Sequence, residues 1–188
     1  MKKIKLFDPT IDQNEVDAIT KTLKSGFWAS GSGSGNVLKF ENEFKKYTQS
    51  KSCVAVNSGT AALNLALSLF DIKNKEVILP SLSFVSTAHC IVENGGTPIF
   101  VDIEPDYFCL NPSEVAKAIT EKTKAIIAVN IFGHPASLRT LRTLADENNL
   151  ILIEDNAQAP LAKEYDSFGV MKFEKRPIGI IDKRSTVF

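Results

Sequence analysis

The chain is poor in the residues that would tie it to a disulfide framework, a metal site or a charged polymer. Its 188 residues include three cysteines, Cys53, Cys90 and Cys109, with no CxxC and no Cys/His pair at metal-ligand spacing. This odd, scattered set argues against a disulfide scaffold and favours buried free thiols. Lys+Arg and Asp+Glu are both 22, so the formal net charge is zero. A balanced charge lacks the basic field that recruits nucleic acid or an anionic membrane.

Long apolar runs are also missing. The start MKKIKLFDPT has no apolar segment of the kind found in a signal peptide. No apolar run reaches the roughly 18 residues that crossing a bilayer requires. We therefore expect a cytoplasmic protein. With 44% hydrophobic residues, the chain has enough apolar material for a packed core, as one compact domain or as part of a larger one.

Short apolar runs alternate with helical patterns along most of the chain. Runs of this kind predict strands at CVAVN, EVILP, PIFVDI, AIIAVNIFG and LILIE. The segments between them predict helices, one of which begins with a cap and a proline at Asn111-Pro112. This order predicts an α/β fold, a three-layer sandwich whose mostly parallel sheet is covered on both faces. Ligands of such sheets bind at the carboxyl ends of the strands.

Residues 1–35 are predicted to form an N-terminal helix followed by a Gly/Ser loop. Asp12-Gln-Asn-Glu15 resembles a capping box, and Gly26 is a suitable helix stop. Two interpretations of the loop at 26–36 are open, a flexible linker or a loop folded over a site. Beyond the loop, an aromatic stripe at helical spacing predicts packing in the core: Phe40, Phe44 and Tyr47.

Two of the predicted strand ends carry residues suited to binding. Ser58-Gly59-Thr60 follows CVAVN at a helix N-terminus, where unpaired N–H groups and the helix dipole favour an anion such as phosphate. The alternative is an ordinary N-cap with a turn glycine. Phe84 follows EVILP, and its ring either stacks on a flat ligand or belongs to the core.

A third strand end is acidic. Glu154 and Asp155 follow the apolar run LILI, and Gln158 comes shortly after them. Carboxylates at a buried strand end are costly unless paired, so they predict a partner with positive charge or donors, unless this is a surface turn after an edge strand. The three strand ends thus offer a phosphate-binding helix N-terminus, an aromatic ring that can stack, and a carboxylate that can pair with a protonated ring nitrogen. Together these features match pyridoxal phosphate.

Seven ordered blocks of the sequence resemble the DegT/DnrJ/StrS family, the pyridoxal-phosphate-dependent sugar aminotransferases of fold type I. The blocks run from about Pro9 to about Lys163: LKSGFWASG, FENEFKKY, VAVNSGTAALNLAL, EVILPSLSFVSTA, GGTPIFVDIEPD, ITEKTKAIIAVNIFGHPA and LILIEDNAQAPLA. The resemblance implies amino transfer from glutamate or glutamine to a keto group of a nucleotide-linked sugar. It also implies a homodimer with sites at the subunit interface.

The same resemblance implies a role for each candidate site residue. Gly59 and Thr60 would bind the cofactor phosphate. Phe84 would stack on the pyridine ring, Asp155 would pair with the ring nitrogen, and Gln158 would meet the ring hydroxyl.

The tail departs from the family pattern. Residues 36–163 would form an incomplete cofactor-binding large domain, and residues 164–188 a divergent tail without the family's Gly-Glu-Gly-Gly turn or second domain. Ser167 and Lys172 keep the family's Ser-to-Lys spacing, which makes Lys172 the candidate Schiff-base lysine, although it follows Asp155 by only 17 positions. In transamination this lysine is both the covalent anchor and the general base.

Three hypotheses follow from this pattern. The first is a sugar aminotransferase truncated before its Schiff-base lysine. The second is a non-catalytic remnant that folds in part and binds pyridoxal phosphate or a full-length subunit. The third is a shortened but active enzyme that uses Lys172. In any of them, His134 either touches substrate or is a structural residue in the turn before Pro135, and His89 is a core or rim residue.

Overall fold

The computed structural model describes residues 5, 8–28, 35–48, 50–160 and 185–187. The chain forms two compact units, Met1–Asn42 and Glu43–Phe188. Lys172 and most of the Gly/Ser loop lie outside the described residues. No helix in the described ranges is long and apolar enough to cross a membrane.

The N-terminal unit is built around a capped helix. Helix α1 (Gln13–Ser25) has the predicted capping box between Asp12 and Glu15, and it ends at Gly26 with a left-handed φ of 68°. Helix α2 runs from Gly35 to Thr48, and Thr48 is the one residue of this helix that is buried. The predicted core packing of the aromatic stripe is therefore wrong for Phe40 and Tyr47, which are exposed.

Acidification is expected to loosen the first turn of α1. The backbone N–H of Asn14 donates to Asp12 Oδ1 (2.7 Å), and this bond holds the pKa of Asp12 below its ordinary 3.8. A carboxyl with a lowered folded-state pKa contributes stability that is present above the ordinary value and lost as the pH falls through the folded one. The Cα chemical shifts of residues 13–16 should therefore move toward coil values only below about pH 4. The same change in an Asp12→Asn variant, which keeps an acceptor without titrating, would contradict this explanation.

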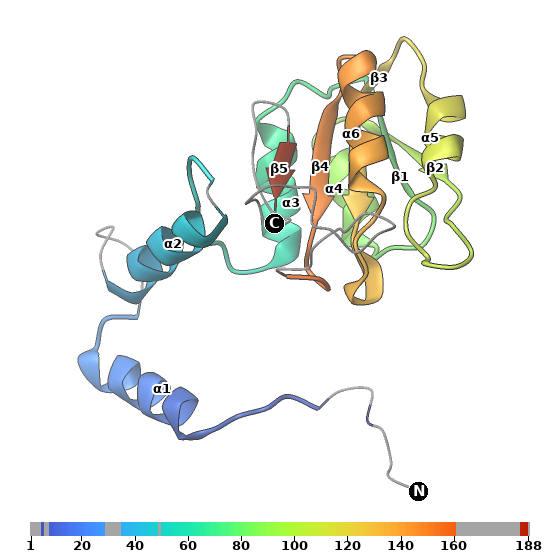
Figure 1. Ribbon diagram of the computed structural model, residues 1–188. Helices are drawn as coiled ribbons and strands as arrows, with labels where there is room; N and C mark the ends of the chain where they lie inside the picture. The colour runs from blue at the N-terminus through green and yellow to red at the C-terminus, as the bar shows by residue number, and fades with distance from the viewer. Residues whose placement is uncertain (1–4, 6–7, 29–34, 49, 161–184, 188) are drawn as a thin grey trace, which may run out of the picture. The chain divides into compact units, whose positions relative to one another are not determined.

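The second unit contains a parallel five-stranded sheet in the order β2-β1-β3-β4-β5 (Figure 1). Every neighbouring pair is parallel, as predicted. The strands are β1 (Glu76–Pro80), β2 (Thr97–Val101), β3 (Thr123–Val129), β4 (Ile151–Asp155) and β5 (Ser185–Val187). Four of them coincide with predicted apolar runs, because only strands covered on both faces tolerate such continuous apolar sequence.

Helices cover both faces of this sheet. They are α3 (Gly59–Ser68), α4 (Ser86–Glu93), α5 (Pro112–Ala118) and α6 (Leu138–Glu147), with a short 3-10 turn η1 (Ile131–Gly133) after β3. The connection from β1 to β2 crosses the sheet in one direction, and a right-handed crossover therefore places α4 on one face. The connections from β2 to β3 and from β3 to β4 cross in the opposite direction, so right-handed crossovers place α5 and α6 on the other face. Since α3 packs on α4, the result is the predicted three-layer sandwich.

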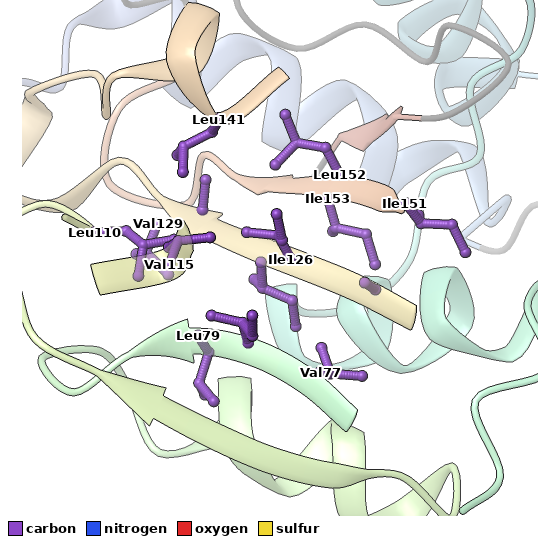
Figure 2. Packing of buried hydrophobic residues seen from close by; sticks show 14 of the residues in the cluster. Val77, Leu79, Leu110, Val115, Ile126, Val129, Leu141, Ile151, Leu152 and Ile153 are labelled. Carbon is purple, nitrogen blue, oxygen red and sulfur yellow. The ribbon is translucent and has the colours of Figure 1, made fainter. Parts of the chain in front are cut away.

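The core lies on both sides of β3, the central strand (Figure 2). Residues Ala125 to Ile131 are all buried, and Ile126 is fully so. From the α6 side, Leu141 packs into this cluster, and Val77 of β1 and Ile153 of β4 flank the central strand. Cys90 and Cys109 are buried free thiols, as predicted, and Cys53 is half-buried. A sheet packed on both faces holds its carboxyl edge rigidly, and that edge carries the candidate site.

The predicted strand at CVAVN is not formed. Residues 53–57 have no strand assignment, and the side chains of Val54 and Val56 are 66% and 40% exposed. An apolar segment becomes a strand only where a neighbour can complete its hydrogen-bond ladder. None of the five strands of the sheet includes this segment, so an apolar pattern alone is not sufficient to predict a strand.

Candidate functional site

The strand order creates a topological switch point at the carboxyl edge of the sheet. Strands β1 and β3 are neighbours, but the chain leaves them toward helices on opposite faces, α4 and α6. This is the switch point at which open α/β sheets bind their ligands. Phe84 follows β1, Asn130 follows β3, and Asp155 ends β4. The parallel sheet therefore brings these three strand ends to one edge.

The N-terminus of α3 lies against the loop that follows β4. Ser58 is the N-cap, and its side chain accepts from the backbone N–H of Ala61 (3.1 Å). Gly59 and Thr60 are exposed, and the first N–H groups of a helix have no partner within the helix. A Cβ added to Gly59 would lie 4.0 Å from the Cβ of Ala157. The positive end of α3 thus lies near Ala157, which follows Asp155 by two residues, and this helix end favours an anion.

Asp155 is a buried carboxylate at the end of an internal strand. Its side chain is 7% exposed, and β4 pairs with β3 and β5, so the alternative of a turn after an edge strand is wrong. Burial raises the pKa of Asp155, and the backbone N–H of Ala157, which donates to Oδ1 at 3.1 Å, offsets only part of this effect. No cationic side chain among the described residues forms an ion pair with it. A protonated donor would relieve this cost.

The thiol of Cys90 connects Asp155 with the start of α3. Burial raises the pKa of Cys90, and the charges of Glu93 and Asp155 raise it further. The same thiol donates to the carbonyl oxygen of Thr60 at 3.4 Å. The Cys90 thiol therefore contacts the first turn of α3 and lies within electrostatic range of the Asp155 carboxylate. Two of the three predicted signals are brought together in this way.

Gln158 is held by the loop after β3. Its Oε1 accepts from the backbone N–H of Phe132 (2.9 Å), and Phe132 itself has a left-handed φ of 54°. Within the described part of the chain, the amide Nε2 of Gln158 donates to no other residue. Nearby in the chain, His134 stacks on Tyr107 with the ring centroids 4.5 Å apart, and its Nδ1 lies 2.8 Å from the carbonyl oxygen of Pro135. His134 thus has local partners in the turn.

Phe84 lies at the same edge on the loop between β1 and α4. Its side chain is 69% exposed, so the core alternative is wrong, and its carbonyl accepts from the N–H of Thr87 (3.0 Å). Strand β3 separates β1 from β4, so the strands that lead to Phe84 and to Asp155 flank the central strand. His89, on the same helix as Thr87, is exposed.

Two buried asparagines belong to this edge, and the sequence analysis assigned neither of them a role. Asn130 is completely buried, and Asn156 is 5% exposed. Asn130 follows the apolar run AIIAV, and a polar residue that directly ends such a run is the signal by which it could have been found.

These groups fit an anionic, aromatic cofactor with a basic ring nitrogen. The start of α3 supplies donors for a phosphate, and Asp155 supplies a desolvated acceptor beside it. Phe84 supplies an exposed ring at the same edge. A doubly wound parallel sheet with these features has the fold of the large domain of fold type I aminotransferases. The chain belongs to the DegT/DnrJ/EryC1/StrS aminotransferase family, whose sequence profile matches residues 9–186.

Individual relatives agree with this family. The chain is 37% identical over 157 residues to GDP-perosamine synthase of Vibrio cholerae, covering 83% of this chain and 42% of the relative. It is 38% identical over 156 residues to L-glutamine:2-deoxy-scyllo-inosose aminotransferase of Streptomyces kanamyceticus, covering 80% and 36%. The fold matches Escherichia coli GDP-4-keto-6-deoxy-D-mannose-3-dehydratase with bound hydrated PLP, with a TM-score of 0.79, 27% identity, and coverage of 89% and 44%. The chain thus spans about two fifths of the curated relatives it matches.

Proposed function

We propose that this chain is the cofactor-binding part of a pyridoxal-5'-phosphate-dependent aminotransferase that acts on a nucleotide-linked keto sugar, with glutamate or glutamine as amino donor. The observation that carries the proposal is the buried carboxylate of Asp155, next to the open N-terminus of α3. The family and the names of the relatives support the reaction class and the sugar. One relative is named for L-glutamine, which supports that donor.

The cofactor would be held at its two ends. The N–H groups of Gly59 and Thr60, the Thr60 hydroxyl and the dipole of α3 would bind the phosphate. Asp155 would accept from a protonated ring nitrogen, and Gln158 Nε2 would donate to the ring hydroxyl while the Phe132 N–H holds the amide. Pyridoxal phosphate, when bound, supplies an electron sink for negative charge on the reacting carbon.

The Schiff-base role belongs to a lysine, and Lys172 is the candidate in this sequence. The amine of such a lysine anchors the aldehyde and then moves a proton between carbons, so its chemistry needs the side chain at the carboxyl edge. Incubation with pyridoxal phosphate, borohydride reduction and peptide mass mapping tests this role. A single adduct at Lys172 supports the shortened enzyme. Cofactor binding without a labelled lysine supports a binding module without turnover or an incomplete enzyme.

Replacing Thr60 with valine tests the phosphate seat. The variant keeps the shape of the exposed side chain and removes one hydroxyl donor. A hydrogen bond to a charged group is worth about 1.5–3 kcal/mol, so pyridoxamine 5'-phosphate should bind roughly tenfold or more weakly by fluorescence titration. This ligand needs no lysine, so its binding is independent of Lys172.

Two controls define the result. Pyridoxamine, which has no phosphate, should bind the wild type and Thr60→Val equally. Thr143→Val, an exposed substitution on α6, should leave both affinities unchanged. Wild-type protein that shows no preference for the phosphorylated ligand would overturn the proposed function.

A further inference from the structure

A pair of buried amides joins the carboxyl ends of β3 and β4. Asn130 is 0% exposed and Asn156 is 5% exposed, so both side chains are removed from water. Buried amides are costly unless hydrogen-bonded. The hydrogen-bond partners of these two side chains therefore indicate the structural role of the pair.

Asn130 makes hydrogen bonds with its backbone and with both ends of its amide. Its N–H donates to the carbonyl oxygen of Asp155 (3.0 Å). Its Oδ1 accepts from the backbone N–H of Ala136 (2.8 Å), and its Nδ2 donates to Oδ1 of Asn156. The bond from Ala136 fixes which end of the Asn130 amide is the acceptor. The Asn156 amide must then present its oxygen to Asn130.

These bonds surround the two side chains proposed to contact the cofactor ring. Asn130 binds the carbonyl of Asp155 through its backbone N–H and the side chain of Asn156 through its amide, so the backbone that directly follows the Asp155 Cα is held at two points. Its bond to Ala136 closes the loop 131–136. That loop contains Phe132, whose N–H holds Gln158. The side chain of Asn130 is thus linked to Asp155 through Asn156, and to Gln158 through the loop 131–136.

We propose that Asn130 is a positioning residue, which sets the orientation of the Asp155 carboxylate and the Gln158 amide toward the cofactor ring; this inference rests on the proposed function. The network leaves one donor unsatisfied. Asn156 Nδ2 is buried and has no hydrogen-bond partner within the described ranges. Asn130 Oδ1, in contrast, accepts from the N–H of the buried Ala136, which an apolar side chain would leave unpaired. The amides hold a directional geometry at the end of the central strand.

The test compares Asn130→Ala with Asn94→Ala. Asn94 is a half-buried asparagine at the end of α4, whose Nδ2 donates to the Cys90 carbonyl (2.8 Å). The first readout is the pKa of the Asp155 carboxyl, measured by ¹³C NMR titration of the chain without ligand. Loss of the network opens the strand end to water, so the pKa should fall toward its ordinary value in Asn130→Ala and stay unchanged in Asn94→Ala. The second readout is the affinity for pyridoxamine 5'-phosphate, which should fall about tenfold in Asn130→Ala only.

The outcomes separate this inference from the proposed function. An Asp155 pKa and a ligand affinity that are equal in wild type and folded Asn130→Ala would overturn the positioning role. Wild-type protein that does not bind the ligand would overturn the proposed function, and the Asp155 titration would still decide whether Asn130 orients the carboxyl. If Asn130→Ala does not fold, Asn156→Ala replaces it, since it removes the same link and keeps the Ala136 bond. An unchanged Asp155 pKa in that variant likewise overturns the inference.

Discussion

Replacing Asp155 with alanine is expected to weaken the binding of pyridoxamine 5'-phosphate by roughly 10- to 100-fold. The contact that the proposed function assigns to Asp155 is a hydrogen bond between charged groups, worth about 1.5–3 kcal/mol, and each 1.4 kcal/mol is a factor of ten. The side chain is buried at the edge of a rigid sheet, so water does not substitute for it well. Fluorescence titration of the wild type and the variant measures the effect. Equal affinities would show that the carboxylate does not contact the ring.

The Asp155→Asn variant tests how the charge of this side chain affects the stability of the folded chain. Burial raises the pKa of Asp155 in the folded chain above its ordinary 3.8. A carboxyl with a raised folded-state pKa contributes stability that is present below the unfolded value and is lost as the pH rises through the folded one. The ligand-free Asp155→Asn variant does not titrate, so it should be more stable relative to wild type at pH 7 than at pH 3. Its amide oxygen can still accept from the Ala157 N–H.

Urea unfolding at the two pH values tests this difference. The exposed residue Asp71 provides the matched control, because Asp71→Asn should show no such gain at neutral pH. A relative stability of Asp155→Asn that is the same at both pH values would mean that the carboxylate pays no desolvation cost in the folded chain. That result would also weaken the case for a cationic partner at this position.

The second large effect is expected in the core. Ile126 lies on the central strand β3 and is fully buried between the two helical layers (Figure 2). Its replacement by alanine removes apolar contacts and leaves a cavity, which typically costs about 2–5 kcal/mol. Domains of this kind have only about 5–15 kcal/mol of stability, so urea unfolding should show a large loss. Ile19→Ala, at a side chain that is 69% exposed on α1, should change the free energy of unfolding by less than about 0.5 kcal/mol.

Local signals predicted most of the secondary structure because they do not depend on the rest of the chain. The capping box at Asp12 and the cap at Asn111 begin helices where the sequence places them. The apolar runs at β1, β3 and β4 form strands because a core covered on both faces is the place where such runs are stable. The failures at CVAVN and at Phe40 have one cause. A strand needs a neighbouring strand to pair with, and a buried ring needs another element to cover it. The sequence of the segment itself does not show whether either is present.

Part of the candidate site could likewise be predicted from local sequence, and part could not. The sequence alone indicated that Phe84 and Asp155 follow strand ends and that Gly59 and Thr60 begin a helix, although the strand predicted before that helix is not formed; resemblance suggested the roles of these residues. It could not show that the start of α3 packs against Ala157, because this contact joins residues nearly a hundred positions apart. It could not show the amide link between Asn130 and Asn156 either, since neither residue has a local partner that reveals it.

The sequence by itself therefore determined the class of fold, the family and the residue types available for binding a phosphate and a ring nitrogen. These follow from periodicity, caps and motif order, which are local properties of the chain. The tertiary structure alone decided that Asp155 is desolvated, that Phe84 is exposed, and that Asn130 holds the strand end. The burial of a side chain and its hydrogen-bond partners depend on which segments of the chain lie next to each other. The spatial order of the parallel strands in the sheet determines these neighbours.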